Sequence, residues 1–148
     1  FNTDYLGFKQ SLQSWLGDTI PDALVLGTGG AAKAVQQALR DLGVSYQVVS
    51  RTKQEGQLTY QDLSENKAWL QSHPLVINTT PLGTFPKVEE FPLIPYEGIS
   101  TDHLLYDLVY NQARTMFLQK GEERGAIVMN GLDMLVLQAE AAWAIWNR

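Results

Sequence analysis

Three small residues could together bind a pyrophosphate. Gly27, Gly29 and Ala32 fall on the pattern G-x-G-x-x-[G/A] in the stretch VLGTGGAA. The first glycine of this pattern permits a tight turn after a strand, the second lets the backbone approach phosphates, and the third small residue lets a helix pack closely. The dipole and free amides at the start of that helix favour negative charge. Because an apolar strand pattern precedes it and a helix pattern follows, the stretch predicts a dinucleotide-binding turn.

The residues after the next strand indicate which dinucleotide would bind. An NAD site has an acidic residue about 20 residues beyond the glycines, where it accepts a hydrogen bond from the ribose 2′-hydroxyl. This chain has Ser50, Arg51, Thr52 and Lys53 there, and its first acid is Glu55. A guanidinium can hold a 2′-phosphate, which a carboxylate would repel. The sequence therefore favours NADP, the alternative being that Arg51 and Lys53 are solvated loop charges.

Strand and helix patterns alternate around these residues. Segment 22–43 reads as a strand, a glycine-rich turn and a helix ending at Gly43. Further strands are predicted in 44–52, 74–83, 103–110 and 126–130, with helices over 3–15, 61–73, 113–125 and 131–148. Segment 83–100, rich in proline and without a clear period, is expected to be a long surface loop. The pattern predicts one α/β domain, a Rossmann-type doubly wound, mostly parallel sheet in three αβα layers.

Composition excludes several other classes of protein. The chain of 148 residues has 45% hydrophobic and 18% charged residues and a net charge of -5, which indicates a globular fold. Without cysteine there is no disulfide, thiolate metal site or cysteine nucleophile, and two histidines argue against a histidine metal site. Scattered basic residues argue against nucleic acid or anionic membrane as a partner. No apolar run is long enough to span a membrane, so a cytoplasmic location is expected.

Several stretches in fixed order resemble one known family. They are NTDYLGF, VLGTGGAAKAV, SRT, INTTPLGTFP, YDLVYNQARTMFL and GAIVMNGLDMLVLQAEAAWAIW. Together they resemble the C-terminal, nucleotide-binding half of shikimate dehydrogenase, and the last stretch is the most specific. The resemblance implies an NADP-dependent oxidoreductase that reversibly reduces 3-dehydroshikimate to shikimate in aromatic amino acid biosynthesis.

The resemblance also implies roles for individual residues. Asp4 would be catalytic, paired with a lysine outside this chain, and would contact the substrate together with Tyr110 and Gln138. The cofactor would be bound by residues of the glycine turn, the S-R-T stretch, the N-T-T stretch and the last helix: Gly27, Thr28, Gly29, Gly30, Ala31, Ser50, Arg51, Thr52, Asn78, Thr79, Thr80, Gly131 and Met134. Two positions depart from the family pattern, since Ser50 replaces an asparagine and Gln112 replaces a proline. The second departure frees the backbone of the loop that would carry Tyr110.

The family has a substrate domain before its N-T-D turn, so such a domain is expected upstream of Phe1. Residues 1–148 would then form an NADP-binding domain whose end helices, 1–17 and 131–148, connect to that substrate domain. Alone, the chain would bind NADP at best and show no turnover. Two alternatives stay open: a related dehydrogenase of quinate or an amino-shikimate compound, possibly NAD-dependent, and a nucleotide-binding module without chemistry.

Two further features carry expectations. Helix 131–148 is apolar on nearly all sides, as is typical of a helix buried by more than one partner. We expect it to pack on helix 1–17 or against a neighbouring chain, and the second arrangement would form a homodimer. Asp107 is expected to be structural and to anchor a loop, and Asp4 by its position alone would be read as a helix cap.

Overall fold

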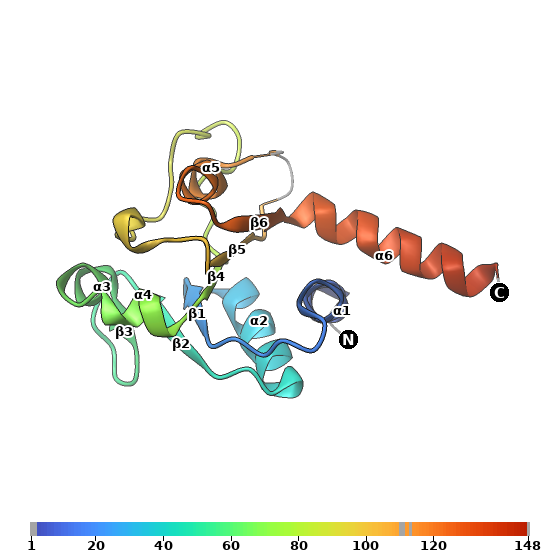
Figure 1. Ribbon diagram of the computed structural model, residues 1–148, viewed down its shortest axis with the longest axis horizontal. Helices are drawn as coiled ribbons and strands as arrows, with labels where there is room; N and C mark the ends of the chain where they lie inside the picture. The colour runs from blue at the N-terminus through green and yellow to red at the C-terminus, as the bar shows by residue number, and fades with distance from the viewer. Residues whose placement is uncertain (1–2, 110–111, 113, 148) are drawn as a thin grey trace.

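A computed structural model describes residues 3–109, 112 and 114–147. Its strands form one parallel sheet in the order β3-β2-β1-β4-β5-β6, which confirms the predicted α/β class (Figure 1). The strands are β1 (Ala23–Leu26), β2 (Tyr46–Ser50), β3 (Leu58–Thr59), β4 (Leu75–Asn78), β5 (Leu104–Asp107) and β6 (Ile127–Asn130). The helices are α1 (Thr3–Leu16), α2 (Gly30–Leu42), α3 (Tyr60–Glu65), α4 (Ala68–Ser72), the 3₁₀ helix η1 (Tyr96–Gly98), α5 (Met116–Glu123) and α6 (Gly131–Trp146).

The sheet is buried on both faces, which explains its nearly continuous apolar strands. Side chains of β1 alternate between two cores, because successive residues of a strand point to opposite faces. Val25 packs on the side of α1 and α2, with Phe8 and Leu39. Leu26 packs on the opposite side, with residues of α3, α4 and α5 such as Leu63. The three-layer arrangement follows from this alternation.

Helix ends match the local sequence signals. Gly17 and Gly43 have left-handed φ values of 61° and 76°, and Gly43 ends α2 by donating its amide to the carbonyl of Arg40. Thr115 caps α5, because its hydroxyl accepts from the amide of Leu118 at 3.3 Å. Glycine and threonine have these roles because one adopts left-handed backbone freely and the other can bond a free amide.

The predicted single helix over 61–73 is wrong. The chain forms two short helices, α3 and α4, because Asn66 is extended and its side chain accepts a hydrogen bond from the amide of Ala68 at 3.0 Å. This asparagine starts a new helical turn instead of continuing the old one. The short strand β3 was not predicted, and the strand expected over 103–110 ends at Asp107.

The connection from β4 to β5 is only in part the surface loop that was expected. Residues 85–90 are exposed, but Ile94 and Ile99 are 5% and 2% exposed and belong to the core beside α5. The described connection contains η1 but no α-helix, so irregular backbone covers the sheet where a crossover helix would normally lie.

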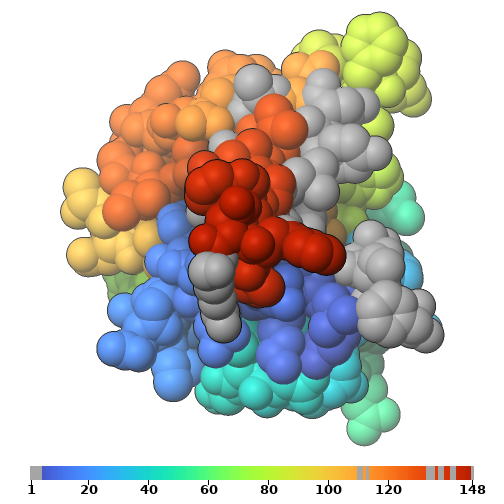
Figure 2. All heavy atoms as spheres, turned by 90° about the vertical axis from the view of Figure 1, so that its right-hand side faces the viewer, coloured from blue at the N-terminus to red at the C-terminus, as the bar shows by residue number. Residues whose placement is uncertain are grey.

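Helix α6 extends away from the sheet, and only its first part lies close to the body of the molecule (Figure 1). It contacts α1, as expected, and Figure 2 shows its end projecting above the α1 surface. Trp143 and Trp146 nevertheless remain 68% and 87% exposed, so packing on α1 does not cover the helix. Within the described residues, none of the helices is both long and apolar enough to cross a membrane.

Candidate functional site

A cavity of about 720 Å³ lies at the carboxyl edge of the sheet. Its lining begins where β1, β2 and β4 end, and the edge of a doubly wound sheet is where ligands bind. The lining residues are Gly27, Thr28, Gly29, Val49, Ser50, Arg51, Tyr60, Thr79, Thr80, Pro81, Leu82, Glu90, Phe91 and Leu93. We call this cavity the groove.

Gly27 makes the turn out of β1. Its φ of 118° favours glycine, and a Cβ at this position would collide with the Thr79 hydroxyl. That hydroxyl is fixed, because it donates to the carbonyl of Leu26 at 2.6 Å. Gly27 also donates its amide to the carbonyl of Val49 at 3.0 Å. The fold itself therefore requires glycine here.

The fold makes no such demand at Gly29. A Cβ built on Gly29 or Gly30 would meet no protein atom within 4 Å, and neither has a left-handed backbone. Gly29 is also the N-cap of the 13-residue helix α2 and, having no side chain, caps none of the helix amides. Free amides beside open space suit an anion such as a pyrophosphate.

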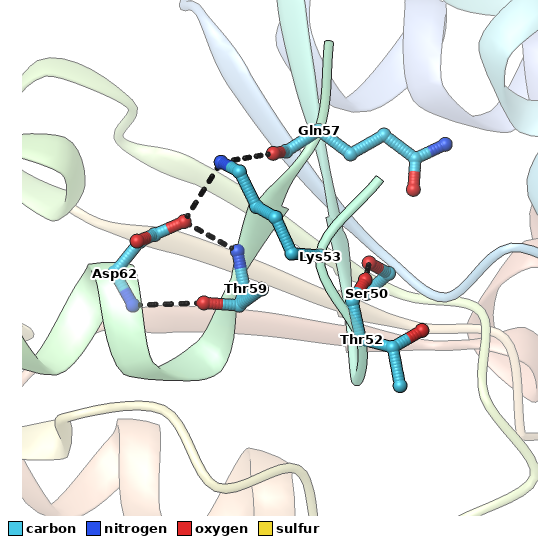
Figure 3. Close-up of polar contacts among 6 residues, drawn as sticks. All are labelled: Ser50, Thr52, Lys53, Gln57, Thr59 and Asp62. Atoms are coloured by element: carbon cyan, nitrogen blue, oxygen red, sulfur yellow. Dashed lines mark hydrogen bonds and ion pairs between the residues drawn. The ribbon is translucent and has the colours of Figure 1, made fainter. Parts of the chain in front are cut away.

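The loop after β2 is held by its own polar contacts (Figure 3). Ser50 donates its hydroxyl to the carbonyl of Thr52. Lys53 Nζ donates to the carbonyl of Gln57 at 3.0 Å and lies 3.5 Å from Asp62 Oδ2. Lys53 is therefore engaged with protein groups, while Arg51 is exposed and lines the groove.

Beneath the groove, a buried network joins β4 to β5. Thr80 donates from its amide and its hydroxyl to Asn78 Oδ1, at 3.0 and 2.7 Å. Asn78 Nδ2 donates to Asp107 Oδ1 at 3.2 Å. The same Asp107 oxygen accepts from the amide of Val109 at 3.0 Å, and its other oxygen accepts from the Thr115 hydroxyl at 2.7 Å. Asp107 therefore anchors the loop after β5.

The carboxyl group of Asp107 is costly to ionise in this setting. Burial raises the pKa of Asp107 to about 6, although the hydrogen bonds from Thr115, Val109 and Asn78 act in the opposite direction. The side chain is 0% exposed and is not among the residues that line the groove. Its place in the site is to hold the strand ends and the N-terminus of α5 together.

The structure brings most of the predicted cofactor residues to one place. The groove is lined by Gly27, Thr28, Gly29, Ser50, Arg51, Thr79 and Thr80, whereas Gly30, Ala31 and Thr52 adjoin it in the sequence and are exposed. Asn78 is 0% exposed and lies below the groove, where it fixes Thr80. These roles stay predictions, since a position alone does not establish binding.

Of the other predicted residues, Gly131 lies at the far end of the sheet edge, beyond β6. Gly131 is buried at the junction of β6 and α6, and its amide donates to the carbonyl of Val109 at 3.3 Å. Tyr110 is outside the described residues. Asp4 lies in α1, and Met134 and Gln138 lie in α6, but their side chains are outside what the structure describes.

Sequence reasoning missed half of the residues that line the groove. The unpredicted lining residues are Val49, Tyr60, Pro81, Leu82, Glu90, Phe91 and Leu93. Of these, Pro81 and Leu82 continue the N-T-T stretch, so its extension into the groove was the one available signal. Glu90, Phe91 and Leu93 come from the loop whose irregular pattern gave no indication of its path.

No family model matches the chain, but known proteins resemble it over nearly its whole length. It is 38% identical over 162 residues to the shikimate dehydrogenase (NADP(+)) of Caldicellulosiruptor saccharolyticus, which covers 99% of this chain and 57% of that protein. The chain thus spans little more than half the length of the curated relatives that it matches.

Solved structures give the same relationship. One is a chorismate mutase/shikimate 5-dehydrogenase fusion protein from Clostridium acetobutylicum, with a TM-score of 0.77 and 36% identity over 99% of this chain and 56% of that one. Another is shikimate 5-dehydrogenase from Thermus thermophilus in complex with NADP(H) and shikimate, with a TM-score of 0.74 and 32% identity over 99% and 56% of the two chains.

The parallel sheet, the glycine turn and the groove at its edge are those of a Rossmann-type α/β domain. The relatives and the solved structures narrow this class further. Over the part of their length that it spans, the chain belongs to the shikimate dehydrogenase family.

Proposed function

We propose that this chain is the NADP-binding part of an enzyme that reversibly reduces 3-dehydroshikimate to shikimate. The observation that carries the proposal is the groove, which combines an uncapped helix N-terminus with an exposed arginine at the end of β2. The first feature suits a pyrophosphate and the second suits a 2′-phosphate. The relatives that match the chain are named as NADP-dependent shikimate dehydrogenases.

The residues of this chain would bind and orient the cofactor. Gly27, Thr28 and Gly29 would hold its pyrophosphate, and Arg51 would hold its 2′-phosphate. Gly131, at the junction of β6 and α6, would lie at the nicotinamide end. NADPH supplies the hydride when it is bound, so the protein contributes position and the exclusion of water.

The substrate would be bound with the help of a second domain. We propose that residues 1–148 form the NADP-binding domain and that α1 and α6 connect it to a substrate domain, which supplies a lysine to act with Asp4 on the carbonyl oxygen. The exposed tryptophans of α6 support this connection, because they need a further surface to cover them. A homodimer formed through α6 is the other arrangement that would cover them. A cytoplasmic location belongs to the same proposal.

Calorimetric titration with NADP and NAD tests the cofactor. We expect NADP to bind more tightly, and Arg51→Ala to weaken NADP binding by roughly tenfold or more because a charge-assisted hydrogen bond is lost. Arg51→Ala should leave the affinity for NAD nearly unchanged. Equal affinity of the unmodified chain for the two nucleotides would contradict the NADP proposal and favour the related dehydrogenases that use NAD.

Reduction of 3-dehydroshikimate tests the division into two domains. The purified chain should bind NADP but give no measurable turnover with NADPH and 3-dehydroshikimate, since half of the proposed cleft lies outside it. Turnover by this chain alone would show that it holds a complete active site.

A further inference from the structure

The pairing of β2 with β3 places Tyr60 beside Arg51. The parallel register pairs Val49 with Leu58 and Ser50 with Thr59. Arg51 and Tyr60 are the residues directly beyond the last pair, and both line the groove. The two side chains are near enough for the charge of Arg51 to lower the pKa of Tyr60. They thus form adjacent parts of one wall.

The hydroxyl of Tyr60 is a donor without a partner in the described chain. Burial raises the pKa of Tyr60 to about 12 despite the opposing effect of Arg51, so the hydroxyl keeps its proton at neutral pH. Within residues 3–109, 112 and 114–147 no hydrogen bond of this hydroxyl is found. Tyr60 is only partly buried and lines the groove, so its hydroxyl is open to an acceptor that an occupant of the groove can supply.

Figure 3 shows the contacts that hold the chain segments on either side of Arg51 and Tyr60. Thr59 and Asp62 form a capping box, in which Asp62 Oδ2 accepts from the Thr59 amide at 2.9 Å and the Thr59 hydroxyl accepts from the Asp62 amide at 3.1 Å. Tyr60 is the first residue of the helix that this box caps. Lys53 ties the loop after Arg51 to the same cap through Asp62.

We propose that Tyr60 is a further cofactor-binding residue, whose hydroxyl joins the guanidinium of Arg51 in binding the 2′-phosphate, and that Lys53 positions this pair without contacting the phosphate. The inference rests on the proposed binding of NADP. A phosphate monoester accepts several hydrogen bonds, and a neutral donor beside a guanidinium adds one without adding charge. NAD has a hydroxyl in place of this phosphate, so Tyr60 contributes to the discrimination between the two cofactors.

Two small nucleotides isolate the phosphate from the rest of the cofactor. Adenosine 2′,5′-bisphosphate carries the 2′-phosphate, and 5′-AMP lacks it. We expect Tyr60→Phe, which keeps the ring, to weaken binding of the bisphosphate roughly tenfold, as for loss of a hydrogen bond to a charged group, and to change binding of 5′-AMP less than about twofold. Equal weakening of both nucleotides, or of neither, would overturn the proposal.

Tyr46→Phe is the matched control. Tyr46 lies on β2, and its hydroxyl accepts from Arg40 at 2.6 Å and donates to Gln36 at 3.3 Å, outside the groove. Its substitution should leave both affinities unchanged. Lys53→Met tests the positioning role. It should weaken binding of the bisphosphate by less than Tyr60→Phe does and leave 5′-AMP unchanged, because Lys53 acts on the phosphate only through Arg51 and Tyr60. A loss of bisphosphate affinity as large as that in Tyr60→Phe would show that Lys53 contacts the phosphate and would overturn that part.

A structure of the unmodified chain with adenosine 2′,5′-bisphosphate gives an answer even where Tyr60→Phe does not fold. The Tyr60 hydroxyl should lie within about 3 Å of a 2′-phosphate oxygen, and a hydroxyl turned away from the phosphate would overturn the proposal. A chain that binds neither nucleotide contradicts the proposed function as well. A chain that prefers the bisphosphate, with Tyr60→Phe unchanged, contradicts only the role of Tyr60.

Discussion

The polar side chains at the edge of the groove find hydrogen-bond partners within this chain, whereas several apolar side chains of the terminal helix α6 stay exposed. At the groove edge, Asp107 and Asn78 are completely buried, yet each is hydrogen-bonded to neighbours in the chain. In α6, the apolar side chains of Trp143, Ile145 and Trp146 are 68%, 61% and 87% exposed. Grouped apolar exposure of this kind marks a surface for another protein segment or chain.

This difference shows that the shape of the groove is determined by this chain alone, whereas the burial of α6 requires another surface. The groove is shaped by contacts among strands β1, β2 and β4 and the loops that follow them, all within the chain. The proposed binding of a nucleotide can therefore be tested on this chain. In the outer part of α6, the side chains that the structure describes are exposed, so their burial depends on a further surface.

Of the substitutions considered, Gly27→Ala should destabilise the groove edge most. The substitution adds a strained φ and a collision with the Thr79 hydroxyl, so we expect the free energy of unfolding to fall by about 2–5 kcal/mol. NADP binding should weaken more than tenfold, because the turn must shift. Chemical denaturation and calorimetry measure the two effects.

Gly43→Ala is the control for that substitution, since Gly43 has a φ of 76° but open space around its Cβ position. It should cost only about 1 kcal/mol and leave NADP binding intact. Equal losses of stability in the two variants would show that the contact with Thr79 does not matter.

The buried Asp107 at the groove edge should make the stability of the fold depend on pH. Its pKa is raised from an unfolded value near 3.9 to about 6, so between pH 4 and 6 the folded chain holds a proton that the unfolded chain has lost. This group therefore stabilises the fold at low pH, and its contribution falls by up to about 3 kcal/mol as the pH rises through that range.

Urea denaturation of the unmodified chain and of Asp107→Asn at pH 4 to 7 tests this dependence. The stability of Asp107→Asn relative to the unmodified chain should increase as the pH rises from 4 to 6, because the asparagine does not ionise. Other carboxyl groups cancel in this difference. A difference that is constant with pH, or of opposite slope, would contradict the raised pKa.

Changing the exposed tryptophans should have the smallest effect on stability. Trp143→Gln combined with Trp146→Gln should change the free energy of unfolding by less than about 0.5 kcal/mol and reduce the binding of a hydrophobic dye. Trp69→Gln is the matched control, because Trp69 is partly buried against the core. This substitution should lower the free energy of unfolding by roughly 2 kcal/mol. Equal destabilisation by the two sets of substitutions would show that α6 is already packed within the chain.

The sequence predicted the part of the groove that depends on local pattern. Gly27, Gly29 and Arg51 could be placed because a strand-turn-helix unit has a fixed geometry, and because parallel strands bring their carboxyl ends to one edge. The C-terminus of α2 could be placed because Gly43 adopts a left-handed backbone without strain. These features need only short stretches of sequence.

The rest of the groove depends on contacts between distant segments. Tyr60 reaches Arg51 only through the register of β2 and β3, which no short pattern specifies. The break between α3 and α4 depends on the hydrogen bond from the Ala68 amide to the Asn66 side chain. The polar sequence around Asn66 is equally compatible with a continuous helix. Ile94 and Ile99 are buried from irregular backbone, where hydrophobic residues follow no period.

The junction of β6 with α6 makes the helix a lever. Asn130 ends the strand and Gly131 begins the helix, with no loop between them. A helix of 16 residues is roughly 24 Å long, so a tilt of about 10° at Gly131 would move its tip by about 4 Å. The Gly131 amide is hydrogen-bonded to the carbonyl of Val109 at the sheet edge, so the pivot lies beside the nicotinamide end proposed for the cofactor. The displacement would be greatest at Trp146, at the other end of the helix.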